Sequence, residues 1–286
     1  MKNIGRKQKI LITVVFFIIG MICFCSWQNN SIVITKSDYF NEKIPSEFDD
    51  FTILHISDLH NKNFGENQMK ILNKVKSVFP DIIVITGDLI DRRKYNLDTA
   101  MTFIKGVKDR APVYYVSGNH EAWSGKYRSI KERLIAEEVN VLDNAKIELF
   151  KGSSSINILG VKDPDFLTSS YMEGTKVTEM TKNLNQWSED ENFKILLSHR
   201  PELFDLYCDN HMDLIFAGHA HGGQFRMPYV GGLIAPDQGV FPQFTSGSYN
   251  KNSSTMFVSR GLGNSIIPIR IFNRPEIVVV TLKTFE

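Results

Sequence analysis

Cysteine is scarce in this sequence, and neither sign of charge is in surplus. Only three cysteines occur in 286 residues, and two of them, Cys23 and Cys25, lie inside an apolar run. Cys208 alone remains for the soluble part, which excludes a disulfide framework and a thiolate-ligated metal cluster. The 33 basic residues nearly balance the 32 acidic ones. That balance excludes the basic surplus expected of a nucleic-acid-binding module.

The remaining composition is that of a globular protein with a substantial core. Hydrophobic residues make up 42% of the chain and charged residues 23%, with 19 glycines and 10 prolines. These proportions exclude a disordered or fibrous chain. We find no internal repeat and no low-complexity tract, so we expect one domain after the N-terminal segment.

The N-terminal segment has the pattern of a membrane anchor. Residues 10–27 contain no charge, and Lys2, Arg6, Lys7 and Lys9 precede them. Eighteen residues are about enough to cross the hydrocarbon core. A cleaved signal peptide is the alternative, but the run is long for one and no small-x-small cleavage pattern follows. Because basic residues stay on the cytoplasmic side, we expect a single-pass protein with 1–9 in the cytoplasm, 10–27 in the membrane and the body outside.

The body alternates between strand and helix patterns. After a linker and first strand in 28–50, the catalytic domain is expected to span 51–286. We predict strands at 31–40, 51–57, 82–88, 113–120, 156–161, 194–199 and 213–219, and helices at 71–79, 101–108, 127–138 and 177–187. From residue 222 onward, we expect loops and short strands, such as 256–260 and 276–282. This alternation is typical of an α/β layered domain.

Five of the predicted strands end in a small polar cluster. The clusters are Asp58-Leu59-His60, Gly87-Asp88-Leu89-Ile90-Asp91, Gly118-Asn119-His120-Glu121, Ser198-His199-Arg200 and Gly218-His219-Ala220-His221. Ligands of α/β sheets gather beyond the carboxyl ends of the strands, so we expect the five clusters to converge. The glycines would let the backbone turn sharply at these ends.

The residue types in these clusters suit a metal site. In an extended segment, residues i and i+2 point the same way, so Asp58 with His60, and His219 with His221, would each present two ligands. Carboxylate, imidazole and amide oxygen without thiolate suit manganese, zinc or iron. Each residue alone has a structural alternative as a turn, cap or core residue. We interpret His55 and His211 in that structural way.

The order of the five clusters resembles a known family. The blocks D-x-H, G-D-x-x-D, G-N-H-E, H and G-H-x-H occur as in the calcineurin-like metallophosphoesterases, over about residues 51–286. The segments L-S-H-R-P-E, G-H-A-H-G-G-Q, A-P-D-Q-G, S-R-G-L-G-N and N-R-P-E-I resemble the small membrane-anchored bacterial phosphodiesterase branch. The resemblance implies a four-layer αββα sandwich, in which two mixed sheets pack face to face between helices.

The resemblance also implies two divalent metal ions. Manganese is the expected metal, and zinc or iron are the alternatives. One ion would be held by Asp58, His60, Asp88 and His221, and the other by Asp88, Asn119, His199 and His219. Two such ions lower the pKa of a bridging water, and the resulting hydroxide attacks phosphorus. The implied function is hydrolysis of phosphomonoesters or phosphodiesters at the outer face of the membrane.

Four further residues receive roles from the resemblance. His120 would stand beside the leaving group, and Asp91 would fix its tautomer. Arg92 and Arg200 are candidates for binding the substrate phosphate, because a guanidinium fork fits that task. For both arginines a structural alternative stays open, as a surface residue.

The sequence is compatible with two other functions. One is a pyrophosphohydrolase of nucleotide-linked lipids at the cytoplasmic face, which the basic N-terminus opposes. The other is a non-catalytic membrane-tethered scaffold, which the complete ligand set opposes. The substrate could be lipid-linked or part of the cell envelope. The aromatic residues of two loops, Phe166, Tyr171, Tyr229, Phe241, Phe244 and Tyr249, could contact an acyl chain, lie in the membrane interface or pack in the core.

Overall fold

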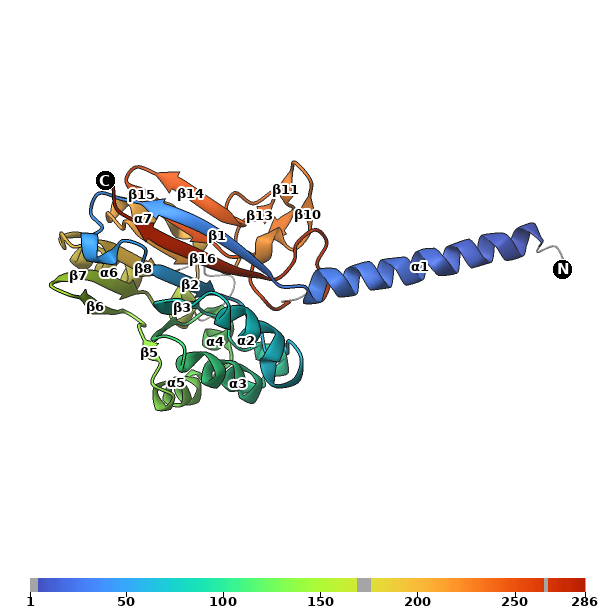
Figure 1. Ribbon diagram of the computed structural model, residues 1–286, viewed down its shortest axis with the longest axis horizontal. Helices are drawn as coiled ribbons and strands as arrows, with labels where there is room; N and C mark the ends of the chain where they lie inside the picture. Colours follow the sequence, from blue (N-terminus) through green and yellow to red (C-terminus); the bar gives the residue numbers. More distant parts are fainter. Residues whose placement is uncertain (1–4, 169–175, 265–266, 286) are drawn as a thin grey trace.

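Two six-stranded mixed sheets form the centre of the molecule (Figure 1). The computed structural model describes residues 5–168, 176–264 and 267–285. The first sheet has the order β1 (Val33–Phe40), β16 (Glu276–Lys283), β2 (Thr52–Ile56), β3 (Ile82–Thr86), β4 (Val113–Val116) and β5 (Asn140–Val141). Strands β2 to β5 are parallel, and β16 runs antiparallel to β2.

The second sheet differs in its edge strands. Its order is β14 (Gly247–Lys251), β15 (Ser254–Val258), β9 (Leu214–Ala217), β8 (Lys194–Leu197), β7 (Ser154–Gly160) and β6 (Ala145–Lys151). The strands from β15 to β7 are parallel, and both edge strands are antiparallel to their neighbours. Two short hairpins follow β9: β10 (Arg226–Met227) with β11 (Gly231–Gly232), and β12 (Ile234–Ala235) with β13 (Gly239–Val240).

Alternating side chains of the strands build the four layers. In β2 and β3, Ile53 and Val84 face the core between the sheets, whereas Leu54 and Ile85 face the helices outside. The outer layer of the first sheet contains α2 (Met69–Lys76), α3 (Leu97–Lys108) and α5 (Tyr127–Ala136). That of the second contains α6 (Thr178–Ser188) and α7 (Phe204–Asp209). The predicted αββα sandwich is therefore confirmed.

Helix α1 (Arg6–Asn30) projects away from these layers (Figure 1). It has 25 residues, and its most apolar 18-residue window has a mean hydropathy of 2.6 with no residue buried inside the molecule. By length and composition it is able to cross a membrane. The helix begins and ends a few residues outside the predicted span 10–27.

Several elements differ from the sequence-based prediction. The edge strands β6 and β14 and the short helix α7 were not predicted. β14 is mostly exposed and shows no apolar alternation, whereas β6 alternates between half-buried and exposed residues over most of its length, a pattern that the prediction missed. The strand predicted at 113–120 ends at Val116, and α4 (Asn119–Trp123) follows it. The short helix forms because Glu121 accepts a hydrogen bond from the backbone N–H of Gly118 at 2.9 Å.

Candidate metal centre

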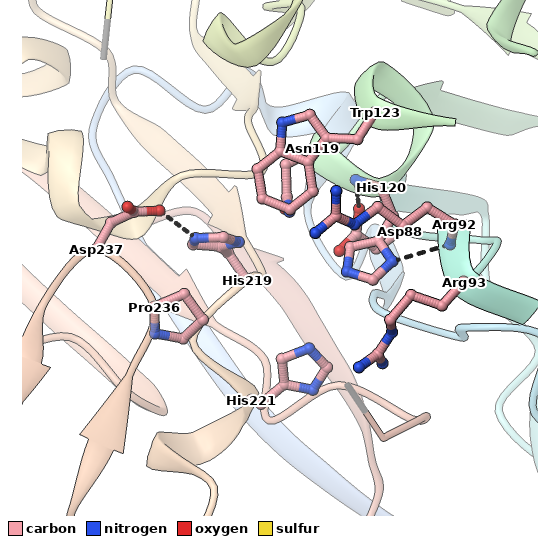
Figure 2. A pocket seen from close by; sticks show the side chains of 10 residues that line it. All are labelled: Asp88, Arg92, Arg93, Asn119, His120, Trp123, His219, His221, Pro236 and Asp237. Carbon is pink, nitrogen blue, oxygen red and sulfur yellow. Dashed lines mark hydrogen bonds and ion pairs between the residues drawn. The ribbon is translucent and has the colours of Figure 1, made fainter. Parts of the chain in front are cut away.

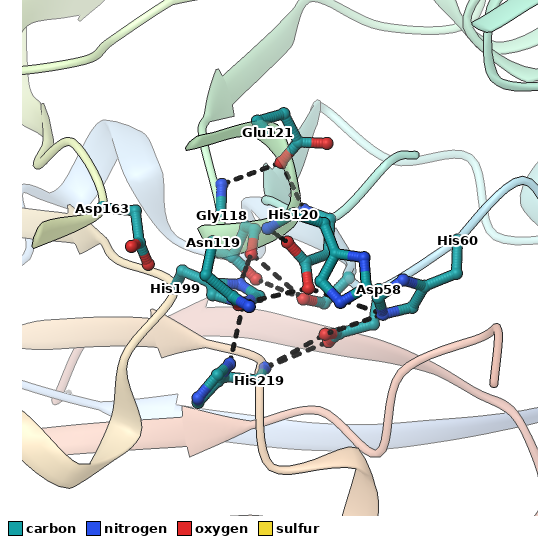
Figure 3. A network of polar contacts seen from close by, with 12 residues as sticks. Asp58, His60, Gly118, Asn119, His120, Glu121, Asp163, His199 and His219 are labelled. Atoms are coloured by element: carbon teal, nitrogen blue, oxygen red, sulfur yellow. Dashed lines mark hydrogen bonds and ion pairs between the residues drawn. The ribbon is translucent and has the colours of Figure 1, made fainter. Parts of the chain in front are cut away.

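The polar clusters at the strand ends converge between the two sheets (Figure 3). Their backbone is not extended, because Asp58, His60, Asp88, His219 and His221 all have φ between 47° and 63°. Non-glycine residues in this left-handed region are uncommon and concentrate at functional sites. Strands β2, β3 and β9 therefore end in sharp turns that direct these polar side chains inward.

Three side chains form a first group of donors. The Nε2 atoms of His60 and His221 are 3.0 Å apart, and Asp58 Oδ1 lies 3.4 Å from His221 Nε2 and 3.8 Å from His60 Nε2. All three residues are buried. Asp58 is held in place because its carboxylate accepts a hydrogen bond from the backbone N–H of His219.

A second group lies beside the first. His199 Nε2 is 3.0 Å from Asn119 Oδ1, 3.1 Å from His219 Nδ1 and 3.4 Å from Asp88 Oδ2. The other nitrogen of His199 donates to the carbonyl of Thr86 at 2.7 Å, which directs the Nε2 lone pair into the group. Asparagine, two imidazoles and a carboxylate thus meet at ligand-to-ligand distances.

Asp88 lies between the two groups. Its Oδ2 is 3.5 Å from His60 Nε2 and 3.4 Å from His199 Nε2, while its Oδ1 accepts from the backbone N–H of His120 at 2.8 Å. Gly118 permits this approach, because a Cβ there would lie 2.3 Å from Asp88 Oδ1. A single carboxylate oxygen is therefore in reach of ions in both groups.

The positions of His219 and His221 differ from the expectation, based on an extended backbone, that both point the same way, and they follow the separate assignment that the resemblance implied. His221 joins the first group and His219 the second. The left-handed backbone at both residues removes the i, i+2 parallelism of an extended strand. The split instead gives each group an imidazole from the same turn.

The two groups fit divalent cations. The donors are carboxylate, imidazole and amide oxygen, which is the ligand chemistry of manganese, zinc or iron. Two imidazole lone pairs 3.0 Å apart repel unless a proton or a cation lies between them. Burial lowers the pKa of His199, but the carboxylates of Asp88, Asp58 and Asp163 together outweigh burial and raise the pKa to about 10. The second group therefore strongly favours positive charge.

His120 lies next to these groups and differs from the expected pairing with Asp91. Its Nδ1 accepts from the backbone N–H of Arg92 at 3.2 Å, and Asp91 Oδ1 is 3.9 Å away. Asp91 instead accepts from the backbone and guanidinium of Arg93. A neutral His120 therefore carries its proton on Nε2, because Arg92 occupies Nδ1. Burial lowers the pKa of His120 to about 4.

Arg200 is not a surface residue. It is only 1% exposed, and its guanidinium donates to Asp163 at 2.7 and 3.0 Å. It also contacts Asp165 and Asp237. This network makes Arg200 a support within the fold, because its donors are engaged by carboxylates and its burial keeps it away from solvent. Phosphate binding by Arg200 stays a prediction, which these ion pairs do not favour.

Asp237 is a residue that the sequence reasoning missed. Its Oδ2 accepts from His219 Nε2 at 2.8 Å and from Arg200 Nη1. The contact places the proton of neutral His219 on Nε2 and directs Nδ1 toward His199. Asp237 belongs to the A-P-D-Q-G segment. The segment carried part of the family resemblance, but no role was predicted for its aspartate. Glu121 is a similar case, because it joins the loops by accepting from the backbone of Asp88, Ile90 and Gly118.

A pocket of about 380 Å³ opens over both groups (Figure 2). Its floor contains Asp88, Asn119, His219 and His221, and its walls contain Arg92, Arg93, His120, Trp123, Pro236 and Asp237. The Arg92 guanidinium stacks 4.4 Å from the centre of the Trp123 ring. Arg92 therefore places positive charge on the wall opposite Asp237.

The comparison with known proteins decides the family. The sequence model of the calcineurin-like phosphoesterases matches residues 51–223. The chain belongs to this family. Calcineurin-like phosphoesterases use a dinuclear divalent metal centre, and this chain carries candidate ligand groups for one. The protein is accordingly a metal-dependent phosphoric ester hydrolase.

Individual relatives agree with this membership. The uncharacterized metallophosphoesterase YkuE of Bacillus subtilis is 30% identical over 259 residues, covering 84% of this chain and 82% of YkuE. A transmembrane protein with metallophosphoesterase domain from Danio rerio is 28% identical, and the match covers 85% of this chain and 55% of that protein. The sulfate thiohydrolase SoxB of Thermus thermophilus shares the fold, with a TM-score of 0.50 and 14% identity over 84% of this chain and 57% of SoxB. The transmembrane relatives and helix α1 indicate a membrane protein.

Proposed function

We propose that this protein is a membrane-anchored dinuclear hydrolase of phosphomonoesters or phosphodiesters whose body lies outside the cytoplasm. The observation that carries the proposal is the position of Asp88, which is 3.5 Å from His60 in one donor group and 3.4 Å from His199 in the other. A carboxylate shared in this way is what two adjacent ions require.

The proposed ligand sets follow the two groups, with manganese as the expected metal and zinc or iron as alternatives. Asp58, His60, Asp88 and His221 would hold one ion, and Asp88, Asn119, His199 and His219 would hold the other. When bound, the two ions acidify water and neutralise charge on the phosphoryl oxygens. The chain's own contribution is to hold these donors in buried, hydrogen-bonded positions.

Three pocket residues act on the substrate or on the ligands in this proposal. His120 directs Nε2–H into the pocket, where it donates a hydrogen bond to the departing oxygen of the ester and stabilises the negative charge that develops there. Arg92 binds a phosphate oxygen from the wall, with its guanidinium oriented by Trp123. Asp237 positions His219. Asp91 acts indirectly, because it holds Arg93 and thereby the loop whose backbone contacts His120.

The substrate is proposed to be lipid-linked or part of the cell envelope. A second groove, of about 560 Å³, begins at His60 and Asp91 and extends past Lys62, Lys94 and Asn264. Asn264 Nδ2 donates to Asn29 Oδ1 at the end of α1. The candidate centre therefore lies near the anchor, and basic side chains line the path between them.

The hydrolase and the non-catalytic scaffold predict different results in an activity assay. A scaffold would bind no ions and hydrolyse nothing, whereas the complete donor set supports catalysis. Purified full-length protein should hydrolyse members of a panel of phosphomonoesters, phosphodiesters and lipid phosphates when manganese is supplied. Asp88→Asn should be inactive, and Asp205→Asn, an exposed carboxylate paired with Lys251, should be unchanged. Absence of hydrolysis across the panel with both ions bound would refute the proposal.

Orientation requires a separate test. In a chain with Cys23→Ala and Cys25→Ala, a Gln186→Cys site on α6 should react with an impermeant thiol reagent on intact cells. Lys7→Cys, ahead of the apolar span, should react only after lysis. The reverse pattern would place the body in the cytoplasm and favour the pyrophosphohydrolase of nucleotide-linked lipids.

A further inference from the structure

The β10–β11 hairpin lies at the end of the body that meets α1 (Figure 1), and exposed apolar side chains occur on it and in the loop before β16. We call five of them the apolar collar: Met227, Tyr229, Val230, Ile269 and Phe272. Tyr229 is fully exposed, and Val230 and Phe272 are 56% and 55% exposed. A groove of about 450 Å³ is lined by residues 226–231 together with Phe272, so the β10–β11 turn and the loop before β16 lie side by side. Contiguous apolar surface of this kind marks a contact with a partner or a membrane.

The apolar collar is continuous with the anchor. The ring of Phe272 lies edge-on to Phe24 of α1, with 5.6 Å between ring centres. Phe24 belongs to the uncharged run and precedes Trp27 by three residues, about 4.5 Å along the helix axis. Phe272 is therefore at the level of the apolar part of α1 and not of the polar residues after it.

The junction between α1 and the body is held by several contacts. Gln28 Oε1 accepts from the backbone N–H of Asn273 at 3.2 Å, and Asn264 donates to Asn29. The Arg274 guanidinium packs 4.9 Å from the Trp27 ring and donates to the carbonyl of Ser31 at 3.0 Å. These contacts fix the height of the body above any bilayer that α1 crosses. Aromatic and basic side chains at this level are typical of the membrane interface.

We propose that the apolar collar lies in the interface of the bilayer that α1 crosses, so that the body rests on the lipid surface. The occupant is the bilayer because the apolar side chains continue directly from the membrane-spanning part of α1. Lipid head groups would surround Arg274 and Arg226, whose positive charge suits their phosphates. This inference goes beyond hydrolysis and holds for any activity of the site.

Spin labels in the full-length protein test the contact. In the background with Cys23→Ala and Cys25→Ala, labels at Tyr229→Cys and Val230→Cys would be examined in phospholipid nanodiscs. The matched control is Phe150→Cys, which is 66% exposed on β6, at the far end of the body from α1 (Figure 1). We expect oxygen accessibility to be several-fold higher, and nickel-chelate accessibility several-fold lower, at 229 and 230 than at 150.

Each other outcome overturns the inference. Equal nickel accessibility at the three sites would place the collar in water. Protection from both reagents, with dipolar coupling between labels, would mean that a second copy covers it. Hydrolysis of a soluble nitrophenyl ester by each labelled variant checks its folding, because neither Tyr229 nor Val230 belongs to the site. A wild-type protein that fails to hydrolyse any ester would refute the proposed function but leave the accessibility result intact.

Discussion

Removal of the Asp237 carboxylate should weaken one metal site without disturbing the fold. In the structure, His219 Nε2 donates to Asp237 at 2.8 Å, and Arg200 Nη1 lies 3.1 Å from the same nitrogen. In Asp237→Ala, the guanidinium is the nearest remaining neighbour of Nε2, and the Glu202 carboxylate lies within 4.8 Å of a His219 ring nitrogen. Because arginine is only a donor, it favours the tautomer with the proton on Nδ1, the atom that faces His199. The ligand nitrogen would then carry a proton.

The expected loss follows from this change. Replacement of an outer partner of a metal-binding histidine typically lowers metal affinity about 10- to 100-fold, or roughly 1.4–2.8 kcal/mol. We expect Asp237→Ala to reach the upper part of this range, because Arg200 reinforces the wrong tautomer. Asp237→Asn should lose less, since its amide oxygen still accepts from His219.

Competition with a fluorescent chelator measures the two affinities in the full-length protein. One ion should bind more weakly in Asp237→Ala, while the ion of the first group should change little. Asp205→Ala removes an equally ionic but exposed carboxylate, paired with Lys251 at 2.8 Å, and should bind both ions normally. Wild-type affinity for both ions in Asp237→Ala would refute the tautomer argument.

Two further predictions concern His120 and Asp143. His120→Ala should keep both ions and lose about 10²- to 10³-fold in turnover of alkyl phosphate esters, because the departing oxygen loses a hydrogen-bond donor. The loss should be much smaller for a nitrophenyl ester, whose phenolate leaves unaided. Equal losses in steady-state assays would exclude a hydrogen bond from His120 to the leaving oxygen. Burial raises the pKa of Asp143 to about 6 against the opposing hydrogen bonds from Ser117, so the folded protein binds this proton more tightly than the unfolded chain. The charged form then costs stability above pH 6, on the order of 2–3 kcal/mol, and the cost disappears as the pH falls toward 4. Asp143→Asn should therefore melt at a higher temperature than wild type at pH 7.5 and at a similar temperature near pH 4.5, and a difference independent of pH would contradict the raised pKa.

The sequence predicted the layered fold and the residues that meet at the strand ends, because both depend on local patterns. Alternation within β2 and β3 sends successive side chains to opposite faces, and parallel neighbours bring Asp58 and Asp88 to the same edge. The family resemblance, now confirmed, added the order in which the ligands are shared. The assignment of these ligands to two ions remains a proposal.

What the sequence could not predict depends on contacts between distant segments. Arg200 is buried by carboxylates at positions 163, 165 and 237, and no spacing along the chain indicates that network. The hydrogen bond from Arg92 to His120 uses a backbone N–H, which every residue except proline has, so residue types do not reveal it.

The structure also distinguishes the aromatic loop residues that pack inside the protein from those that are exposed, which the sequence could not do. Phe244 and Tyr249 pack against each other with ring centres 5.0 Å apart, and Phe166 packs against Tyr127. Tyr229 and Phe241 are exposed, and Tyr171 lies outside the described residues.

The metal content of the Asp88→Asn variant tests the shared-carboxylate account most directly. Asp88 Oδ2 faces both donor groups at 3.4–3.5 Å, so its neutralisation should weaken both sites together. We expect two ions per chain in purified full-length wild type and in Asp38→Asn, an exposed carboxylate of β1, by elemental analysis after dialysis. Asp88→Asn should retain fewer than one ion per chain and no measurable phosphoester hydrolysis. Two ions per chain with near-normal turnover in Asp88→Asn would contradict the account.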